Sequence, residues 1–394
     1  MTGWQWMLLV SMAAIGFGLV AFVAFLRSRG MGRWIDRYVI HRLTAPRPRT
    51  EGPIDVLICF ADHYEPKAYG ADREAGLRRV EAWHREFPRQ FARFKDSDGR
   101  PPRWSYFFPE EEYEPEYLDL LADLCRQGFG EVEIHLHHFD DTAEGLREKL
   151  ERFQRILVDR HGLLSHDQAG RTRYAFIHGN WTLCNGRDDG QYCGVDNELA
   201  VLHETGCYVD MTFPSAPDPT QPKVFNSIYW AADIPGRKRS HEVVHPLGGK
   251  PSDDALLMIQ GPLLFDWANR KWGLFPRLEN ACLQESQLPS MRRLDLWLQA
   301  GIHVPARPEW RFVKLHMHGA PEDAHHALLG EPMVRFHEAL AERAAKDTNF
   351  RYHYVTAREM YNLARAAEVG FKGSVAEVLD FEVVSNLALA RSAV

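Results

Sequence analysis

Residues 54–66 read IDVLICFADHYEP, a nearly continuous apolar run that ends abruptly in polar residues. A strand inside a parallel sheet is buried on both faces, so its sequence is apolar throughout rather than alternating. Asp62, His63 and Glu65 would then lie at the carboxyl end of this strand. Because α/β proteins place binding and catalytic groups at that end, the segment predicts a parallel α/β fold with its site at the carboxyl edge of the sheet.

Strand-like and helix-like segments alternate along the chain after this first strand. Further strands are expected at residues 103–109, 131–138, 173–181, 207–215, 255–265 and 311–319, and residues 350–367 continue the alternation. Helical spacing of apolar residues separates the strands, at 74–94, 114–128, 145–162 and 194–206. Repeated strand–helix units indicate one barrel-like or doubly wound α/β domain, which we place at residues 54–365. Residues 218–252, rich in Pro, Gly and Ser, are expected to form a loop insertion, and residues 366–394 a C-terminal tail.

Four of the expected strands end in side chains that bind metals or carry protons: Asp62, His63 and Glu65; His135, His137, His138, Asp140 and Asp141; His178 and Asn180; His316 and His318. In a parallel layout these ends lie on one rim, so the side chains would converge. His135 and His137 are two residues apart and therefore share a strand face. Neutral imidazoles with an aspartate suit Zn²⁺ or a similar divalent cation. We therefore predict a metal site, and it depends on Asp62 meeting the histidines of residues 135–138.

Each of these residues also has a purely structural explanation. A single strand histidine is usually a hydrogen-bonded packing residue, and Asp62 could cap the helix that follows. Residues 178–181 could form only a turn. Three histidine-containing strand ends, two of them with the i, i+2 spacing, favour a metal or hydrolytic site over these explanations.

The N-terminal region predicts a membrane anchor. Residues 6–26 contain no charged side chain, and at about 1.5 Å per residue a helix of this length spans a hydrocarbon core of roughly 30 Å. No Lys or Arg precedes the run, and it is longer than the apolar core of a signal peptide. We therefore expect a short tail at residues 1–5 and an uncleaved anchor at residues 6–26.

A basic segment and linker follow the anchor at residues 27–53. Positive charge next to a span tends to stay in the cytoplasm, so the main domain is expected to face the cytoplasm. Residues 33–43 also mix apolar side chains with arginines, which suits either an interfacial helix or an amphipathic helix docked on the domain. The arginines of the segment are Arg27, Arg29, Arg33, Arg37, Arg42, Arg47 and Arg49.

Composition excludes one class of partner. The 394 residues carry a net charge of −7, and no aromatic-interleaved basic stripe follows the juxtamembrane segment, so nucleic acid is not expected to bind. The six cysteines show no CxxC pair, which favours buried thiols in a reducing compartment.

The order of these motifs resembles that of the polysaccharide deacetylase superfamily, also called the NodB-homology fold or the chitooligosaccharide deacetylase-type carbohydrate esterases. The resemblance spans roughly residues 53–363. It rests on CFAD at 59–62 in the place of the family's Thr-Phe-Asp-Asp, on YFF at 106–108, on GEVEIHLHH at 130–138, on NELAVLHETGCYVDMTF at 197–213 and on FVKLHMHG at 312–319. It implies a deformed (β/α) barrel with a divalent metal, typically Zn²⁺, at its mouth.

The resemblance also implies roles for individual residues. Asp62 becomes a metal ligand, while Ala61 replaces the family's general base, so Glu65 or Asp140 is expected to take the proton instead. The family's metal histidines are four residues apart; here either His135 and His137 bind together, or His137 pairs with Asp141. The remaining expectations are His138 as a further ligand, His316 or His318 as the catalytic acid, and His178, Asn180 and Trp181, in the place of the third motif, as substrate-binding residues.

These inferences together predict a membrane-anchored, metal-dependent hydrolase. Its expected reaction is removal of an acyl group from a polysaccharide or a lipid-linked sugar. Two alternatives remain: a glycan-binding or polysaccharide-assembly protein that kept the fold and lost the base, which Ala61 favours, and another metal-dependent amidase or glycosidase, which the number of histidines favours.

Overall fold

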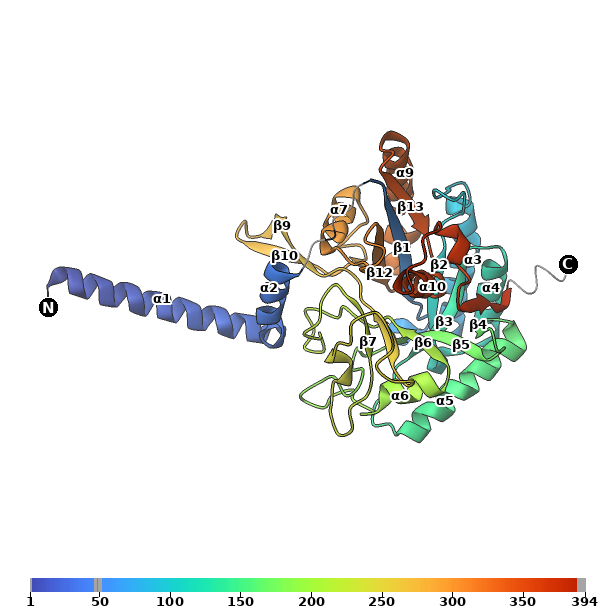
Figure 1. The fold of residues 1–394 in the computed structure, drawn as a ribbon, viewed down its shortest axis with the longest axis horizontal. Helices are drawn as coiled ribbons and strands as arrows, with labels where there is room; N and C mark the ends of the chain where they lie inside the picture. Colours follow the sequence, from blue (N-terminus) through green and yellow to red (C-terminus); the bar gives the residue numbers. More distant parts are fainter. Residues whose placement is uncertain (1, 46–47, 49–51, 388–394) are drawn as a thin grey trace.

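The computed structural model describes residues 2–45, 48 and 52–387, and shows one α/β domain from which a long N-terminal helix projects (Figure 1). Most of the linker before the first strand lies outside the described residues, together with Arg47, Arg49 and the end of the expected C-terminal tail, residues 388–394.

A mostly parallel sheet forms the centre of the domain. Its strands, in hydrogen-bonded order, are β11 (Cys282–Leu283), β12 (Trp310–Met317), β1 (Ile54–His63), β2 (Trp104–Pro109), β3 (Gly130–Leu136), β5 (Thr172–His178), β6 (Cys207–Asp210), β8 (Leu256–Ile259) and β7 (Ile228–Ala231). A further strand, β13 (Phe350–Tyr354), pairs in parallel with the first half of β1, and β7 runs antiparallel to β8. The prediction of an α/β fold is thus confirmed. The pairings among described residues leave β11 and β7 as separate ends, so they do not establish a closed barrel.

Helices cover the sheet on two faces. Seven of them bury side chains against one face: α3 (Arg73–Phe91), α4 (Pro115–Arg126), α5 (Ala143–Arg155), α6 (Glu198–Glu204), α7 (Met291–Ala300), α8 (Glu322–Leu329) and α9 (Glu331–Lys346). On the other face α10 (Ala357–Glu368) packs against side chains from β1, β5, β6, β8 and β12. We call the side of α10 the inner face and the opposite side the outer face.

The alternation of β1 shows how the sequence divides between these faces. Val56, Ile58 and Phe60 belong to the outer cluster, whereas Cys59 and Ala61 belong to the inner one. Because successive strand residues point to opposite faces, a run that is apolar at every position is buried on both sides.

The parallel register brings the polar strand ends to one edge. Asp62 lies beside Met317 of β12 and Tyr106 of β2, and His135 lies beside Ile177 of β5. The strand ends predicted to converge are therefore neighbours, and which side chains meet depends on the face to which each points.

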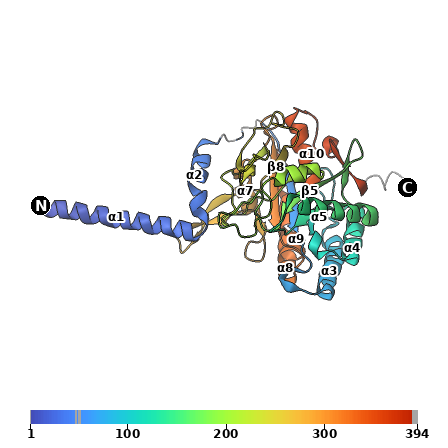
Figure 2. The ribbon, with the colours of Figure 1, turned by 90° about the horizontal axis from the view of Figure 1, so that it is seen from below.

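The N-terminal segment leaves the domain as α1 (Gly3–Ser28), the one helix among the described residues that is long and apolar enough to cross a membrane. A short 3-10 turn, η1 (Met31–Arg33), connects it to α2 (Ile35–Thr44), which runs across the end of α1 (Figure 2). Trp34 and Tyr38 are buried among Ala216, Phe225 and Leu263, so one face of α2 is docked on the domain.

Three boundaries differ from the sequence predictions. The expected loop at 218–252 contains β7 and the 3-10 turn η5 (Ser240–Glu242). The expected strand at 255–265 is divided between β8 and β9 (Leu264–Lys271), which forms a separate antiparallel hairpin with β10 (Phe275–Glu279). The expected tail carries a strand, β14 (Val383–Ser385), which pairs with β4 (Ser165–Asp167), itself paired with β5. Pairing along the sheet edge, which local sequence does not specify, accounts for these differences.

Candidate functional site

Two groups of histidine and carboxylate side chains lie at the carboxyl edge of the sheet in the described part of the chain. Within each group the possible ligand atoms all lie within 4.8 Å of one another. The open group consists of His63, Glu65 and His135, and the closed group consists of His138, His178 and Glu198. Both have the chemical composition of a metal site, so their surroundings must distinguish them.

The open group lies on the inner face because of strand alternation. His63 shares its face with Cys59 and Ala61, and the rings of His63 and His135 lie 4.7 Å apart between centroids. Glu65 follows the end of β1 and places its Oε1 atom 3.1 Å from Nε2 of His135. Two separate strands and the loop after one of them thus aim three ligand-type side chains at the same point.

Hydrogen bonding fixes the tautomer of His135. Its Nδ1 lies 2.9 Å from the carbonyl oxygen of Ile177, which can only accept, so Nδ1 carries the proton. In neutral His135 the lone pair of Nε2 then faces the carboxylate of Glu65, and the two acceptors repel unless a proton or a cation lies between them. Histidines that bind a metal usually donate their other ring N–H to a carbonyl or carboxylate in this way, which fixes the orientation of the ring.

His63 adds a second imidazole suited to binding a cation. Its Nδ1 is buried and has no hydrogen-bond partner. Burial lowers the pKa of His63 well below its usual value, and the nearby His135 adds to the effect, so the ring is neutral. For Glu65, burial acts to raise the pKa, but a hydrogen bond from His135, which requires a proton on its Nε2, and the adjacent imidazoles lower it to about 2. A divalent cation would take the place of that proton, and two imidazoles with one carboxylate form a donor set that fits such a cation.

His137 and His318 connect the open group to solvent. Their Nε2 atoms lie 3.5 and 3.9 Å from Oε1 of Glu65, and their side chains are about one-third exposed. Burial acts to lower the pKa of His137, but Glu111 at Nδ1 raises it, whereas burial lowers the pKa of His318. A Cβ atom on Gly179 would lie 2.3 Å from the His137 ring, so that ring packs directly on the glycine backbone.

Asp62 contributes no atom to either group and does not meet the histidines of residues 135–138, on which the predicted metal site depended; His63 and Glu65 lie beside His135 in its place. Its side chain points to the outer face, where the carboxylate accepts hydrogen bonds from the Gly319 N–H at 2.7 Å and from Trp104 Nε1 at 2.9 Å. Burial raises its pKa to about 7. Asp62 and His63 are adjacent on a strand, so only one of them can face the inner side, and that residue is His63.

The closed group is enclosed on the outer face. His138 is 2% exposed, and His178 and Glu198 are not exposed. Nε2 of His138 lies 2.9 Å from Oε1 of Glu198, whose other oxygen accepts from the N–H of Cys184. Nδ1 of His178 accepts from the N–H of Asn180 at 3.1 Å, so in neutral His178 the proton is on Nε2, which lies 3.4 Å from Thr182 Oγ1 and 3.7 Å from Glu198. The carboxylate of Glu198 thus already has N–H donors, as in a hydrogen-bond network.

Several predicted site residues lie elsewhere. His178 is enclosed and cannot contact a substrate, and Asn180 and Trp181 form the turn that supplies its backbone donor. Asp140 is exposed and belongs to neither group. Asp141 binds Lys149 at 2.7 Å and lies 3.6 Å from His138 Nδ1, not beside His137.

His316 and His318, at the end of β12, lie at different distances from the open group. His316 pairs in register with Ala61, one residue before Asp62, and its ring lies 6.4 Å from that of His63 with a buried, unpartnered Nδ1. His318 lies further along, at 4.8 Å from the His63 ring. His318 rather than His316 therefore adjoins the open group.

Two members of these groups were not predicted from the sequence to be possible metal ligands. His63 was recognised only as a strand-end residue, and Glu198 was expected to be an ordinary helix residue. Strand parity relative to His135 could have indicated His63, whereas nothing local distinguishes Glu198 from other helix glutamates.

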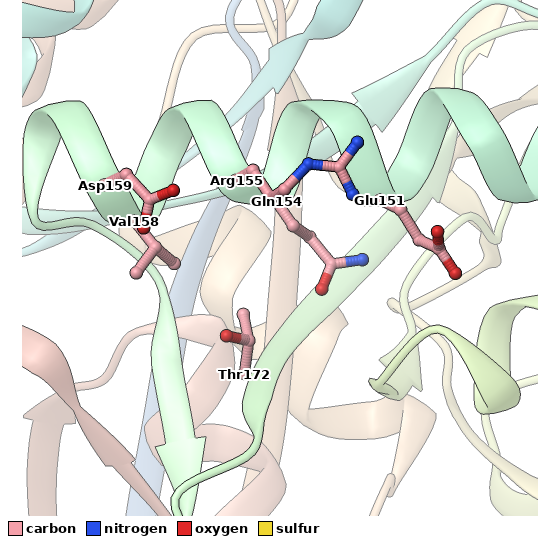
Figure 3. Close-up of a pocket in the computed structure, with 6 residues that line it drawn as sticks. All are labelled: Glu151, Gln154, Arg155, Val158, Asp159 and Thr172. Atoms are coloured by element: carbon pink, nitrogen blue, oxygen red, sulfur yellow. The ribbon is translucent and has the colours of Figure 1, made fainter.

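A surface pocket lies away from both groups. It measures about 210 Å³ and lies between the helix that includes α5 and the start of β5 (Figure 3). Its lining residues contain no histidine or cysteine: Glu151, Gln154, Arg155, Val158, Asp159 and Thr172. This pocket therefore adds no metal-ligating chemistry.

Comparison with known proteins adds no assignment. No family model matches the sequence, and no curated protein matches it. The geometry of the two groups therefore carries the functional argument.

Proposed function

We propose that the chain is a membrane-anchored, metal-dependent hydrolase that removes an acyl group from a polysaccharide or a lipid-linked sugar. The observation that carries the proposal is the open group, in which His63, Glu65 and His135 place their ligand atoms within 4.8 Å of one another. On this proposal the curved sheet is a deformed (β/α) barrel of the polysaccharide deacetylase type. The resemblance described from the sequence supplies the substrate class.

The open group offers the chemistry that such a reaction requires. His63, His135 and Glu65 would hold a divalent cation such as Zn²⁺, which lowers the pKa of water and polarises a carbonyl. The Ile177 carbonyl holds His135 in the tautomer that leaves Nε2 free to ligate. The fixed orientation costs no rearrangement when the cation binds.

His137 and His318 are placed to carry protons. Both border Glu65 and both reach solvent, so a substrate entering from the edge of the sheet meets them first. Glu111 binds Nδ1 of His137 and orients that ring, which suits protonation of the leaving amine or alcohol. His318, whose pKa is lowered by burial, suits the acceptance of a proton from water.

α1 supports the membrane part of the proposal. It is long and apolar enough to span a bilayer; Arg27 lies in its last turn, and Arg29 and Arg33 follow it. Positive charge at this end favours a cytoplasmic position for the domain.

Metal content and acyl release test the proposal together. The full chain, purified in detergent, is expected to contain about one divalent ion per chain by elemental analysis and to release acetate from N-acetylated amino-sugar oligomers or a lipid-linked N-acetyl sugar. His63→Ala is expected to lose both, whereas His84→Ala, at the half-buried His84 that binds Asp123 outside both groups, keeps both. A chain that remains metal-free after incubation with Zn²⁺, Mn²⁺ and Co²⁺ contradicts the proposal.

A binding protein without hydrolysis is the second candidate. Ala61 occupies the place of the family's base, and Asp62 is fully engaged by Gly319 and Trp104. A chain that contains the metal and binds acylated sugars by calorimetry, yet releases no acetate, would support this candidate over the first.

A further inference from the structure

The β9–β10 hairpin exposes an unusual amount of apolar surface. Trp267, Trp272 and Leu274 are 61, 74 and 70% exposed, and Phe275 is 41% exposed. Large apolar side chains gathered on a protruding turn mark an interaction surface when nothing covers them. Trp267, Trp272 and Leu274 stay mostly uncovered by the described residues, and Phe275 is partly covered by Phe25 and Trp272.

Basic residues accompany these apolar side chains. Arg270 and Lys271 are the last two residues of β9, next to the turn, and Nζ of Lys271 lies 4.8 Å above the ring of Trp272. Within the described part of the chain neither basic side chain lies within 4.0 Å of a carboxylate oxygen, and Arg270 donates only to the carbonyl of Trp267, so both charges face the surroundings. Tryptophan with Lys and Arg is the composition found at the interface of a membrane with anionic lipids.

The hairpin lies beside the expected membrane span. The ring of Phe275 is 6.2 Å from that of Phe25, which lies in the last turns of α1 just before Arg27. Figure 1 shows the hairpin extending from the domain toward the side on which α1 leaves it, next to α2. The turn therefore reaches the level at which α1 would emerge from a bilayer.

Packing holds the hairpin and α2 in place. Phe265 at the base of the hairpin lies 5.2 Å from Tyr38 of α2. The opposite side of α2 exposes Val39, Ile40 and Leu43. The exposed side of α2 and the hairpin turn thus border the end of α1 together, and each presents apolar side chains near arginines or lysines.

We propose that the tip of the β9–β10 hairpin, meaning residues 267–275 with the ends of both strands and the turn between them, inserts into the interfacial layer of an anionic bilayer beside α1. On this proposal α2 lies along the same surface. The apolar side chains enter the interface, and Arg270 and Lys271 bind lipid phosphates. The domain is then held at a second point and cannot rotate freely about α1. This inference is independent of the proposed hydrolase activity.

A site-specific probe in the full chain tests this contact. Leu274→Cys carries an environment-sensitive fluorophore, and the chain is reconstituted in nanodiscs of phosphatidylcholine with phosphatidylglycerol, one chain per disc. Ile15→Cys in α1 serves as the inserted reference. Ala169→Cys, in the exposed turn between β4 and β5 on the side of the domain away from α1, serves as the aqueous reference (Figure 1). The parent chain, labelled in parallel, corrects for its own cysteines.

The expected result is that the probe at 274 shifts to the blue and is quenched severalfold more by lipid-borne nitroxide than by aqueous iodide, as the probe at 15 is. The probe at 169 behaves in the opposite way. Adding Arg270→Glu and Lys271→Glu to the 274 variant is expected to reduce the lipid quenching at least twofold. The proposal is overturned if the probe at 274 is quenched like the probe at 169 while the probe at 15 is quenched as an inserted one. It is also overturned if the probe at 274 is shielded from iodide only in discs that hold two chains, because a second copy of the chain would then cover the hairpin.

Discussion

The open and closed groups contain the same kinds of side chain but differ in where their protons lie. In the open group a carbonyl binds Nδ1 of His135, so Nε2 faces Glu65 and the space between them must hold a proton or a cation. In the closed group Glu198 accepts from Nε2 of His138 and from the N–H of Cys184, and Nε2 of His178 lies 3.4 Å from Thr182 Oγ1. The first arrangement needs a positive charge at its centre, and the second already satisfies its acceptor. Proximity of ligand-type residues is therefore weaker evidence for a metal than the tautomer that their neighbours impose.

The largest expected difference between the groups is in metal affinity. His135→Ala removes an oriented ligand and is expected to weaken metal binding about 100-fold or more. His178→Ala, in the closed group, is expected to leave the stoichiometry unchanged. Titration with a chromogenic metal competitor measures both. If both variants lost the metal equally, the histidine tautomers would not explain which group binds it.

Substitutions in the closed group, rather than in the open group, are expected to lower the free energy of unfolding. Glu198→Ala leaves the enclosed His138 imidazole and the Cys184 N–H without their acceptor, and is expected to cost about 3 kcal/mol of unfolding free energy. Glu198→Gln, which keeps an acceptor oxygen, is expected to cost less than half as much. Urea unfolding followed by tryptophan fluorescence compares the two. A cost below about 1 kcal/mol for Glu198→Ala would argue against a structural network.

His353 provides a benchmark for a histidine held only by ion pairing. Its two nitrogens lie 3.0 Å from Asp55 and 2.7 Å from Asp98. Burial acts to lower the pKa of His353, but these carboxylates raise it to about 9. Since the pKa is higher in the folded chain, the stabilisation is complete below about pH 6.5 and is lost as the pH rises toward 9.

The corresponding test replaces His353 by Gln. At pH 6 the variant is expected to be about 2–3 kcal/mol less stable than the parent chain, and the difference should shrink steadily up to pH 9. Denaturant midpoints measured across this range follow it. A difference that grows with pH would show that His353 is neutral in the folded protein.

The smallest effects come from adding one methyl group next to each group. A Cβ on Gly179 would meet the ring of His137 at 2.3 Å, and one on Gly194 would meet Nδ1 of His138 at 2.8 Å. His137 is partly exposed and can move, so Gly179→Ala is expected to reduce acyl release about tenfold with little loss of stability. His138 is enclosed, so Gly194→Ala is expected to cost about 1–2 kcal/mol and leave the metal bound. Thermal midpoints and acetate release separate the two variants. If Gly179→Ala lowered stability and Gly194→Ala lowered acetate release, the closed group rather than the open group would be the active one.

The sequence predicted the strands better than the faces. The apolar run at 54–63 and the repeated units after it gave β1, β2, β3, β5, β6 and β12 near their observed positions. The i, i+2 spacing correctly placed His135 and His137 on one face, where their rings lie 4.7 Å apart. Phe60 and Ala61 are equally buried, so nothing in the run shows which of Asp62 and His63 points inward. That choice depends on long-range pairing.

Other parts of the molecule were not accessible to the same reasoning. Glu198 becomes important only because α6 brings it beneath the ends of β3 and β5. The start of β9 was merged with β8, because residues 255–265 are apolar on both sides of Gln260, Gly261 and Pro262. Both cases reflect tertiary context that overrides local pattern.

On the proposed function, the burial of Trp34 and Tyr38 limits how the chain can meet its substrate. Only residues 29–33 lie between the end of α1 and this buried anchor, so no long tether separates the domain from α1. With α1 in a bilayer, the domain stays at a constant height and samples molecules by lateral diffusion in two dimensions. A molecule that remains in the leaflet meets it repeatedly, whereas a soluble polymer must first approach the surface. This geometry favours a lipid-linked sugar over a free glycan.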